Sequence, residues 1–548
     1  MAGLAAAFGS GAMTNSIEEI EESKLIFVIG SNTTACHPLI AGRIIRAKEK
    51  GAKLIVADPR EIQLSNLADI SVHHRLGSDV ALLNGMMHVI IKNNWHNEKY
   101  IEERCEDFQA LKEKVAEYTP EKVSLITGVS EKDINAMAEL YALNSPASLL
   151  YAMGITQHTT GVDNVKSCCN IAMLCGNVGI RGGGVNPLRG QNNVQGACDM
   201  GGLPNVFTGY QPVSDPIVLK KFSSAWECTL SDTPGMTITD MISAIDKGKI
   251  KAMYIIGENP KLSDPDWNHL NNALKKLDFL AVQDIFLSET AQIADVVFAS
   301  SSFAEKDGTF TNTERRCSRI NKAIDPVGNS LSDWEIISKL STAMGYKMSY
   351  SSAEEIFNEM TALTEKSYGG MTYERLGING LQWPCPDFNH PGTCYLHKES
   401  FARGKGKFHA IEFKEPAEHA CRDYPFLLTT GRMFAHFHTG TMTRISQHLD
   451  VEQKTAYVEI NHKDAEKLDI KTDDILVLSS RRGTMEVPAR ITDTVKPGTV
   501  FMPIHFGESP ANILTDSNAF DPLAKIPEFK VGAVKIEKLV ENPVETIV

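Results

Sequence analysis

The stretch that decides the fold is residues 25–58, LIFVIGSNTTACHPLIAGRIIRAKEKGAKLIVAD. It begins and ends with apolar runs, at residues 25–30 and 53–58, that are typical of buried strands. Between them, residues 38–48 carry apolar side chains at helical spacing, and Gly51 marks the end of that helix. A strand, a helix and a second strand in this order predict a βαβ unit of a parallel sheet.

The chain repeats this unit. Apolar runs at residues 252–257 and 279–284 flank a helical stretch near residues 270–276. In each unit a glycine ends the first strand and an aspartate ends the second strand, and the two are 28 residues apart in the first unit and 27 in the second. In both units an Ala-Asp pair follows, and its aspartate lies 11 residues after the aspartate of the strand. The residues concerned are Gly30, Asp58 and Asp69 in the first unit and Gly257, Asp284 and Asp295 in the second. The repeat predicts two related mononucleotide-binding halves.

From about residue 422 the pattern changes to short strands separated by tight turns. Residues 481–483 (RRG) and 496–498 (KPG) are typical of hairpin turns, so this part predicts a β-barrel, and residues 384–407 are expected to form a connecting loop. The fold class is therefore α/β with a β-barrel. We expect a first α/β domain at residues 1–190, a second with connecting segments at 191–420, and the barrel at 421–548.

Composition excludes several classes of protein. The 55 Lys and Arg against 68 Asp and Glu give a net charge of −13 without a basic tract, which argues against a nucleic-acid partner. The 11 cysteines are odd in number and spread over a long chain, which argues against a disulfide framework. None of them has the C-x-x-C spacing of the usual iron–sulfur or zinc motifs. No secretory n-region and no run of about 20 apolar residues is present. We expect a cytoplasmic chain with no membrane span.

Each βαβ unit offers a nucleotide site. A strand that ends at a polar turn opening a helix presents free N–H groups to a phosphate, and Asp58 or Asp284 at the next strand end can accept from a ribose hydroxyl. The alternative is that these are ordinary turns of an α/β sheet. A strict G-x-G-x-x-G is missing, so the nicotinamide fingerprint is weak.

Two further runs are rich in polar residues. Residues 181–202 (RGGGVNPLRGQNNVQGACDMGG) are expected to form a glycine-rich ligand loop, in which Arg189 holds a carboxylate or phosphate or, alternatively, ties loop carbonyls. In residues 431–444 (GRMFAHFHTGTMTR), His436 and His438 would share one face of a strand. They could bind a metal, but no third ligand is evident in the sequence. The favoured interpretation is that they form hydrogen bonds to an anionic ligand or to polar groups of the core.

Residues 189–201, RGQNNVQGACDMG, resemble the signature loop of molybdopterin-dependent formate dehydrogenase catalytic subunits, within the molybdopterin oxidoreductase (dimethyl sulfoxide reductase) family. Further similar runs cover essentially the whole chain in the family's order. They are residues 9–17 (GSGAMTNSI), 57–60 (ADPR), 283–286 (QDIF), 307–315 (DGTFTNTER), 438–444 (HTGTMTR) and 525–530 (KIPEFK).

The resemblance implies two Rossmann-like domains, a double-psi type barrel and a bis-molybdopterin guanine dinucleotide with Mo or W. One guanine nucleotide would contact Asn32, Asp58 and Asp79, with Gly154 and Gln157 near its pterin, and the other would contact Gln283, Asp284, Asp307 and Arg432. Gly190, Gln191, His438, Thr439, Asn512 and Lys530 are further expected pterin or phosphate contacts, and Arg189 would hold formate beside the metal.

The implied reaction takes formate to carbon dioxide, or the reverse, and passes two electrons to the metal and on to iron–sulfur subunits or a hydrogenase. The family's [4Fe–4S] domain and metal-ligating selenocysteine or cysteine have no counterpart in this sequence. We therefore expect a chain that begins after an upstream selenocysteine codon and is inactive by itself. The alternatives are a nitrate reductase or other molybdopterin oxidoreductase, and a non-catalytic fragment that binds the cofactor.

Overall fold

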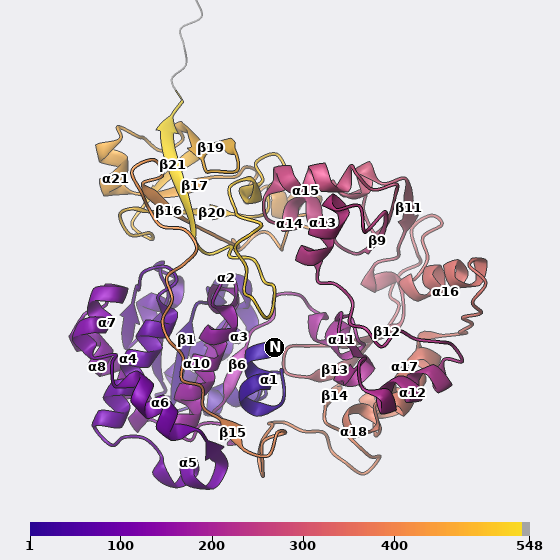
Figure 1. Ribbon diagram of the computed structural model, residues 1–548, viewed down its shortest axis with the longest axis horizontal. Helices are drawn as coiled ribbons and strands as arrows, with labels where there is room; N and C mark the ends of the chain where they lie inside the picture. The colour runs from indigo at the N-terminus through magenta and orange to yellow at the C-terminus, as the bar shows by residue number, and fades with distance from the viewer. Residues whose placement is uncertain (540–548) are drawn as a thin grey trace, which may run out of the picture.

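The computed structural model describes residues 1–539, which form two sheet-containing α/β units, a mixed helical region and a barrel (Figure 1). In the first α/β unit, five parallel strands lie in the order β3-β2-β1-β5-β6. The strands are β1 (Leu25–Ile29), β2 (Lys53–Ala57), β3 (Ile70–Val72), β5 (Ala147–Tyr151) and β6 (Val185–Pro187). The predicted βαβ unit is confirmed, with α3 (Pro38–Glu49) as its crossover helix.

Both faces of this first sheet are buried. Phe27, Ile29 and Ile55 belong to a large apolar core on one face, while Val28 and Val56 belong to a second core on the other. The helices of the unit are α1 (Ala2–Phe8), α2 (Thr33–Cys36), α4 (Asp79–Lys92), α5 (Glu98–Arg104), α6 (Phe108–Val115), α7 (Pro120–Thr127), α8 (Glu131–Leu143), α9 (Met153–Thr156) and α10 (Gly161–Leu174). Burial on both sides is the normal state of a parallel sheet.

The second α/β unit repeats the first with fewer strands. Its parallel sheet has the order β11-β10-β9, with β9 (Ala252–Ile256), β10 (Phe279–Asp284) and β11 (Val296–Ala299). The helices α13 (Ile238–Asp246), α14 (Pro260–Ser263) and α15 (Trp267–Leu274) accompany it, and apolar side chains of α13 and α15 pack against one another and against Met253. The predicted repeat is confirmed.

The match between the two units extends to individual hydrogen bonds. The N–H of Leu54 donates to Asp69 Oδ2 at 2.8 Å, and the N–H of Leu280 donates to Asp295 Oδ2 at 2.7 Å. The aspartates of the predicted Ala-Asp pairs thus hold the start of β2 in the first unit and of β10 in the second. Gly30 and Gly257 both end their strands with positive φ, 58° and 64°.

A mixed helical region is formed by segments that precede and follow the second sheet in sequence, and its short helices surround a small antiparallel sheet of β12 (Gly308–Thr311), β13 (Arg316–Ile320) and β14 (Leu381–Gln382). The helices are α11 (Val194–Asp199), α12 (Pro216–Ala225), α16 (Asp333–Ala343), α17 (Ala353–Leu363), α18 (Glu365–Tyr368) and α19 (Tyr373–Leu376). Two hairpin strands, β7 (Val206–Phe207) and β8 (Gln211–Pro212), pair beside them. The expected loop at residues 181–202 is therefore partly regular, because β6 and α11 lie within it.

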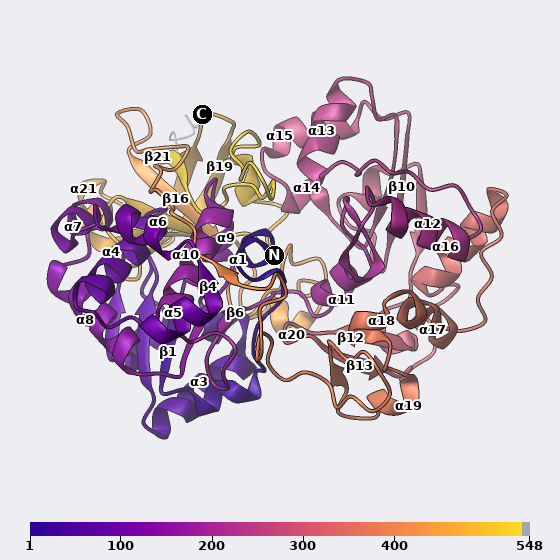
Figure 2. The same cartoon turned by 60° about the horizontal axis from the view of Figure 1, so that its bottom comes forward.

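The expected connecting loop contains one short strand. Within it, β15 (Gly406–Lys407) pairs in parallel with β4 (Cys105–Glu106) of the first unit, and Phe401 packs into the core of that unit. The chain therefore returns along the first α/β unit, and not along the second, before it enters the barrel. Figure 2 shows this segment crossing the first unit.

The predicted barrel is confirmed as a closed barrel in the order β16-β20-β17-β19-β18-β21. Its strands are β16 (Phe426–Gly431), β17 (Val458–Asn461), β18 (Ile475–Ser479), β19 (Thr484–Thr492), β20 (Thr499–Pro503) and β21 (Gly532–Lys538), with α20 (Gln447–Asp450) and α21 (His462–Lys467) between them. The first predicted hairpin is confirmed, since β18 and β19 pair antiparallel across residues 481–483. The second is wrong, because β17 lies between β19 and β20.

Candidate functional site

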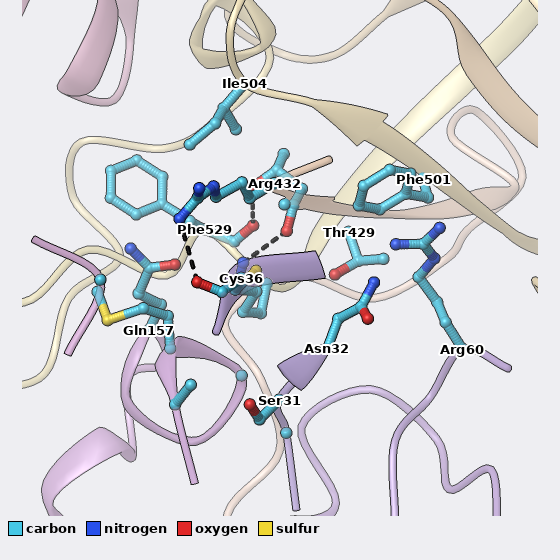
Figure 3. A pocket seen from close by; sticks show the side chains of 18 of the residues that line it. Ser31, Asn32, Cys36, Arg60, Gln157, Thr429, Arg432, Phe501, Ile504 and Phe529 are labelled. Carbon is cyan, nitrogen blue, oxygen red and sulfur yellow. Dashed lines mark hydrogen bonds between the residues drawn. The ribbon is translucent and has the colours of Figure 1, made fainter. Parts of the chain in front are cut away.

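A cavity lies where the carboxyl ends of the first sheet face the barrel. Its walls come from the turns after β1, β2 and β5, from the loop at residues 188–191, from α14 of the second unit and from the barrel. Figure 3 shows side chains from the first unit and from the barrel around this space. The crevice beyond the carboxyl ends of parallel strands is the usual ligand position in open α/β sheets.

Two glycines shape one wall of the cavity. Gly30 ends β1 and Gly154 lies after β5, and the N–H of Gly154 donates to the carbonyl of Gly30 at 3.0 Å. A Cβ at Gly30 would lie 2.8 Å from the carbonyl carbon of Gly154, and a Cβ at Gly154 would lie 2.5 Å from the Gly30 oxygen. The two turns approach this closely only because neither residue has a side chain.

Cationic groups from different units converge on the cavity. Lys530 is half-buried, and the loss of water around its ammonium lowers the pKa of that group to about 8. Its Nζ donates to the carbonyl of Thr430 at 2.6 Å. Arg432 donates from Nε to the carbonyl of His436 at 2.9 Å. Arg60 packs 3.4 Å from the centroid of the Phe501 ring. Three cations in one cavity, in a chain of net negative charge, are suited to hold a diphosphate.

Carboxylates and amides occupy the same walls. The N–H of Arg60 donates to Asp58 Oδ1 at 3.0 Å, and burial raises the pKa of the Asp58 carboxyl. Asn32 and Gln157 supply amide groups from the turns after β1 and β5. This set of donors and acceptors fits the polar edges of a nucleotide and a pterin.

A buried ionic network backs the cavity. The His74 ring lies 2.9 Å from Asp79 Oδ1, and His158 lies between Asp79 at 4.0 Å and Glu528 of the barrel segment at 3.7 Å. Burial lowers the pKa of His158, but Glu528 and Asp79 outweigh it and raise the pKa overall. Burial acts to raise the pKa of Asp79, yet the two histidines hold it below its ordinary value. The network ties the barrel to the first unit at the edge of the cavity.

The loop that carries Arg189 adjoins the cavity through its next two residues. Gly190 and Gln191 line the cavity, whereas Arg189 does not. Arg189 Nη2 donates to the carbonyl of Gly11 at a long 3.4 Å, and its buried Nε has no hydrogen-bond partner within residues 1–539. An arginine whose fork is only weakly engaged is available to an anionic ligand.

Asp199, at the end of the same loop, anchors it. Its carboxylate accepts from Gln195 Nε2 at 2.7 Å, from the Tyr210 hydroxyl at 2.7 Å and from Trp383 Nε1 at 2.9 Å, and the Tyr368 hydroxyl also donates to it. The aspartate is buried, so these four donors replace water around its charge. Nothing in the local sequence indicated this role.

The predicted residues of the second unit lie outside the cavity. Gln283 is buried and donates to Asp333 Oδ1 at 2.8 Å. Asp284 Oδ1 accepts from the N–H of Ile285 at 2.7 Å, and Asp307 Oδ1 accepts from the N–H of Lys322 at 3.0 Å. Arg432, which was expected beside this group, lies instead with Asn32 and Asp58.

The strand geometry expected for His436 and His438 is wrong. Both follow the end of β16 in an irregular loop, and His438 has φ 48°. His436 bonds the carbonyl of Gln453 at 2.8 Å, while His438 lines the cavity. Within residues 1–539 no group of three or more His, Cys, Asp or Glu side chains is placed to hold a metal ion, and no helix there is long and apolar enough to cross a membrane.

The structure therefore gathers most of the predicted residues in one place. Those that line the cavity are Asn32, Asp58, Asp79, Gly154, Gln157, Gly190, Gln191, Arg432, His438, Thr439, Asn512 and Lys530. The cavity is also lined by five residues that were not predicted from the sequence, namely Cys36, Arg60, His158, Phe501 and Phe529. Arg60 carried a usable signal, because it follows Asp58 by two residues at a strand end. The two phenylalanines are indistinguishable in sequence from barrel core residues.

Comparison with known families gives two matches. Residues 3–343 match the family described as "Molybdopterin oxidoreductase", and residues 426–533 match the "Molydopterin dinucleotide binding domain". The second match begins at the first residue of β16 and ends within β21, so it corresponds to the barrel.

Similar curated proteins cover nearly the whole chain. The F420-dependent formate dehydrogenase subunit alpha of Methanocaldococcus jannaschii is 53% identical over 98% of this chain and 80% of its own length. Formate dehydrogenase H of Escherichia coli is 39% identical over 99% and 76%. The assimilatory nitrate reductase catalytic subunit of Bacillus subtilis is 34% identical over 96% and 76%. Among solved structures, acetylene hydratase from Pelobacter acetylenicus matches with a TM-score of 0.76 and 19% identity, over 98% of this chain and 80% of the other, which shows a shared fold.

Proposed function

Because this chain belongs to the molybdopterin oxidoreductase family, we propose that it forms the dinucleotide-binding body of a formate dehydrogenase catalytic subunit. The substrate would be formate or carbon dioxide, and the cofactor a bis-molybdopterin guanine dinucleotide with Mo or W. The relatives named as formate dehydrogenases, at 39% to 53% identity, support formate over other substrates of the family. The observation that carries the proposal is the convergence of the predicted residues on one cavity between the first sheet and the barrel.

The residues present fit one guanine dinucleotide. Lys530 and Arg432 are positioned to donate to the diphosphate, as is the free Nε of Arg60, which is buried and has no hydrogen-bond partner in the described residues. Asp58 is placed to accept from ribose hydroxyls or from the N–H groups of a guanine edge. Gln157 and Gly154 would face the pterin, and His438, Thr439 and Asn512 would close over the cofactor from the barrel side. The mixed parallel and antiparallel strand pairing supports a double-psi barrel.

The second dinucleotide is proposed for the equivalent edge of the second sheet, where Gln283, Asp284 and Asp307 lie. When bound, the cofactor supplies a metal that accepts two electrons from formate. Arg189 would hold the formate carboxylate through its planar fork and so orient the C–H bond. The loop anchored by Asp199 keeps that arginine next to the cavity wall formed by Gly190 and Gln191.

Formate-dependent reduction of a viologen dye tests the reaction. We expect the enzyme that contains this chain to reduce the dye with formate, and the Arg189→Lys variant to lose most of that activity, because an ammonium cannot replace the bidentate fork. The Lys220→Arg variant, a charge-preserving exchange outside the cavity, serves as the control. Dye reduction that is equal in the wild type and in Arg189→Lys would contradict the assignment of the arginine.

Cofactor content separates the alternatives. We expect purified protein to release guanine nucleotide on acid hydrolysis, with Mo or W found by elemental analysis. Oxidation of reduced viologen by nitrate, without formate activity, would instead assign a nitrate reductase, as the Bacillus subtilis relative suggests. Bound nucleotide without either activity would assign a cofactor-binding protein. Absence of guanine nucleotide would contradict all three.

Two further expectations belong to the proposal. Iron–sulfur subunits or a hydrogenase are the proposed electron acceptors, and the cytoplasm is the proposed location. Co-purification of iron–sulfur proteins with a tagged chain tests the partners.

A further inference from the structure

We propose that Thr313 is a positioning residue for Arg189. Thr313 lies in the turn between β12 and β13, far from Arg189 in sequence. Its hydroxyl donates to the carbonyl of Pro187 at 2.7 Å and accepts from the N–H of Arg189 at 3.3 Å. One side chain thus clamps the backbone on both sides of Leu188. The inference rests on the proposed function only in taking Arg189 as the formate-holding residue.

The clamp is needed because the arginine has few other restraints. Its Nη2 makes one long bond, to Gly11, and its buried Nε makes none within residues 1–539. Gly190, the residue that follows, has open space around it, since a Cβ built there meets nothing within 4 Å. Within the described residues, the bond to Thr313 is the hydrogen bond that the backbone of Arg189 makes, so it restrains the point from which the arginine side chain extends.

The turn that carries Thr313 is itself rigid. Arg315 is fully buried and donates from Nε to the carbonyl of Met13 at 2.9 Å and from Nη2 to that of Cys394 at 3.0 Å. The Glu314 carboxylate accepts from the N–H of Ile17 at 2.8 Å. Bonds to separate segments fix the turn from several directions. Thr313 can therefore transmit a defined position to the loop.

The loop is tied to the same hairpin at a second point. Asn193 Oδ1 accepts from the N–H of Thr311 at 2.8 Å, two residues before Thr313. Asp199 then holds the far end of α11 through its aromatic donors. Of these restraints, only the Thr313 bond reaches the backbone of Arg189 itself. Thr313 is therefore the member expected to act on substrate binding.

Hydrogen exchange measured by mass spectrometry tests the clamp without any need for activity. In the 548-residue chain we expect Thr313→Val to speed amide exchange at Arg189 about fivefold, because the isosteric side chain cannot accept from the N–H. Thr313→Ser keeps the hydroxyl and should exchange like the wild type. Thr309→Val, the same exchange in the same hairpin, is the matched control. Unchanged exchange in Thr313→Val would overturn the inference.

Thr313→Ala is a second variant for the case in which Thr313→Val does not fold, since it removes the hydroxyl without adding a methyl group. If Thr313→Val loses its circular dichroism signal, the exchange rate of the alanine variant decides. Faster exchange at Arg189 in folded Thr313→Ala supports the clamp, and wild-type exchange overturns it.

Steady-state kinetics of the formate-oxidising enzyme separate the clamp from the proposed function. We expect Thr313→Val to raise the KM for formate about tenfold and to change kcat less than about twofold. The reason is that a displaced arginine weakens the binding of formate in the ground state and in the transition state to the same extent. Thr313→Ser should restore the wild-type KM. If Arg189→Lys leaves the KM and kcat for formate unchanged, the proposed role of Arg189 fails. If Arg189→Lys impairs the enzyme but Thr313→Val does not, the inference about Thr313 fails.

Discussion

The two α/β units share their local structure and differ in their surroundings. Ile29 and Ile256 each end the first strand of a unit, directly before a glycine with positive φ. Ile29 is 0% exposed and Ile256 is 43% exposed. In the first sheet β5 and β6 continue beyond β1, whereas within residues 1–539 no strand pairs with the outer edge of β9. The same local pattern therefore forms one sheet buried on both faces and one with an open face.

The open face is apolar. Tyr254, Ile256 and Phe279 lie on it with 36%, 43% and 44% exposure. In the repeat, local sequence sets strand, turn and helix, while neighbours elsewhere in the chain set burial. Substitutions at equivalent positions of the two units measure that difference directly.

Lysine at the equivalent isoleucines should give the largest contrast. We expect Ile29→Lys to destabilise the first unit by about 4 kcal/mol or more, because it removes apolar packing and buries an unpaired charge. Ile256→Lys should cost about 0.5 kcal/mol, since the ammonium can reach water. Thermal unfolding followed by circular dichroism checks both. Equal losses would show that the second sheet is as well covered as the first.

Alanine at the equivalent glycines comes next. Gly30→Ala would place its Cβ 2.8 Å from the backbone of Gly154, so we expect a loss of about 3 kcal/mol from overlap and left-handed strain together. At Gly257 a Cβ meets nothing within 4 Å, which leaves only the strain of about 1 kcal/mol. Urea unfolding curves measure the difference. A similar cost at both sites would mean that the close approach of the two turns in the first unit relaxes freely.

In each unit an asparagine lies two residues after the glycine that ends the first strand, but the two asparagines have different surroundings. Asn259 is buried, accepts from Thr290 and donates to Glu289 at 2.6 Å, so Asn259→Ala should cost about 2 kcal/mol through unpaired buried groups. Asn32 faces the cavity, and Asn32→Ala should cost less than about 0.5 kcal/mol. Thermal melts test both values. Retained guanine nucleotide in purified Asn32→Ala would speak against its role in the site.

The smallest expected effect is the loss of stability when the aspartate of the Ala-Asp pair is replaced, and this loss should depend on pH. Burial acts to raise the pKa of Asp69, but Lys48, the Leu54 N–H and Lys53 outweigh it and hold the pKa below its ordinary value. A lowered folded-state pKa contributes stability above the unfolded value of about 3.9, and that stability is lost as the pH falls through the folded value. We expect Asp69→Asn to cost about 0.5 kcal/mol at pH 7 and nothing near pH 2.

The control for this prediction is the equivalent Asp295→Asn. Asp295 accepts from the equivalent N–H of its own unit, that of Leu280, but no lysine pairs with it in the described residues. Its exchange for asparagine should therefore change stability less than Asp69→Asn at neutral pH. Unfolding midpoints at pH 7 and at acid pH compare the two. A pH-independent cost for Asp69→Asn would exclude the charge as its cause.

Local patterns in the sequence predicted much of this fold. The apolar runs, the helix spacing and the 11-residue step to the Ala-Asp pairs located both βαβ units, because these features depend on residues close together in the chain. The turn at residues 481–483 also follows from local chemistry. The turn at residues 496–498 shows the limit of such reasoning, because turn residues do not say which strands will pair.

The candidate site was foreseen less completely. Asp58 and Asn32 lie at strand ends, where parallel sheets bind ligands, so the pattern of the first unit alone pointed to them. The resemblance to a family added Lys530, Asn512 and Arg432. The pairing of Arg432 with the first unit could not be foreseen, because it depends on how the barrel sits on that unit.

By itself the sequence determined the two repeated βαβ units, the change to short strands near residue 422 and the polar runs that carry the candidate chemistry. These features are encoded by neighbours a few residues apart, whose spacing sets periodicity and turns. The tertiary structure alone decided that one sheet is buried on both faces, that the barrel closes over the first unit, and that Thr313 reaches the backbone of Arg189. Those outcomes depend on contacts between distant segments, which local spacing does not encode.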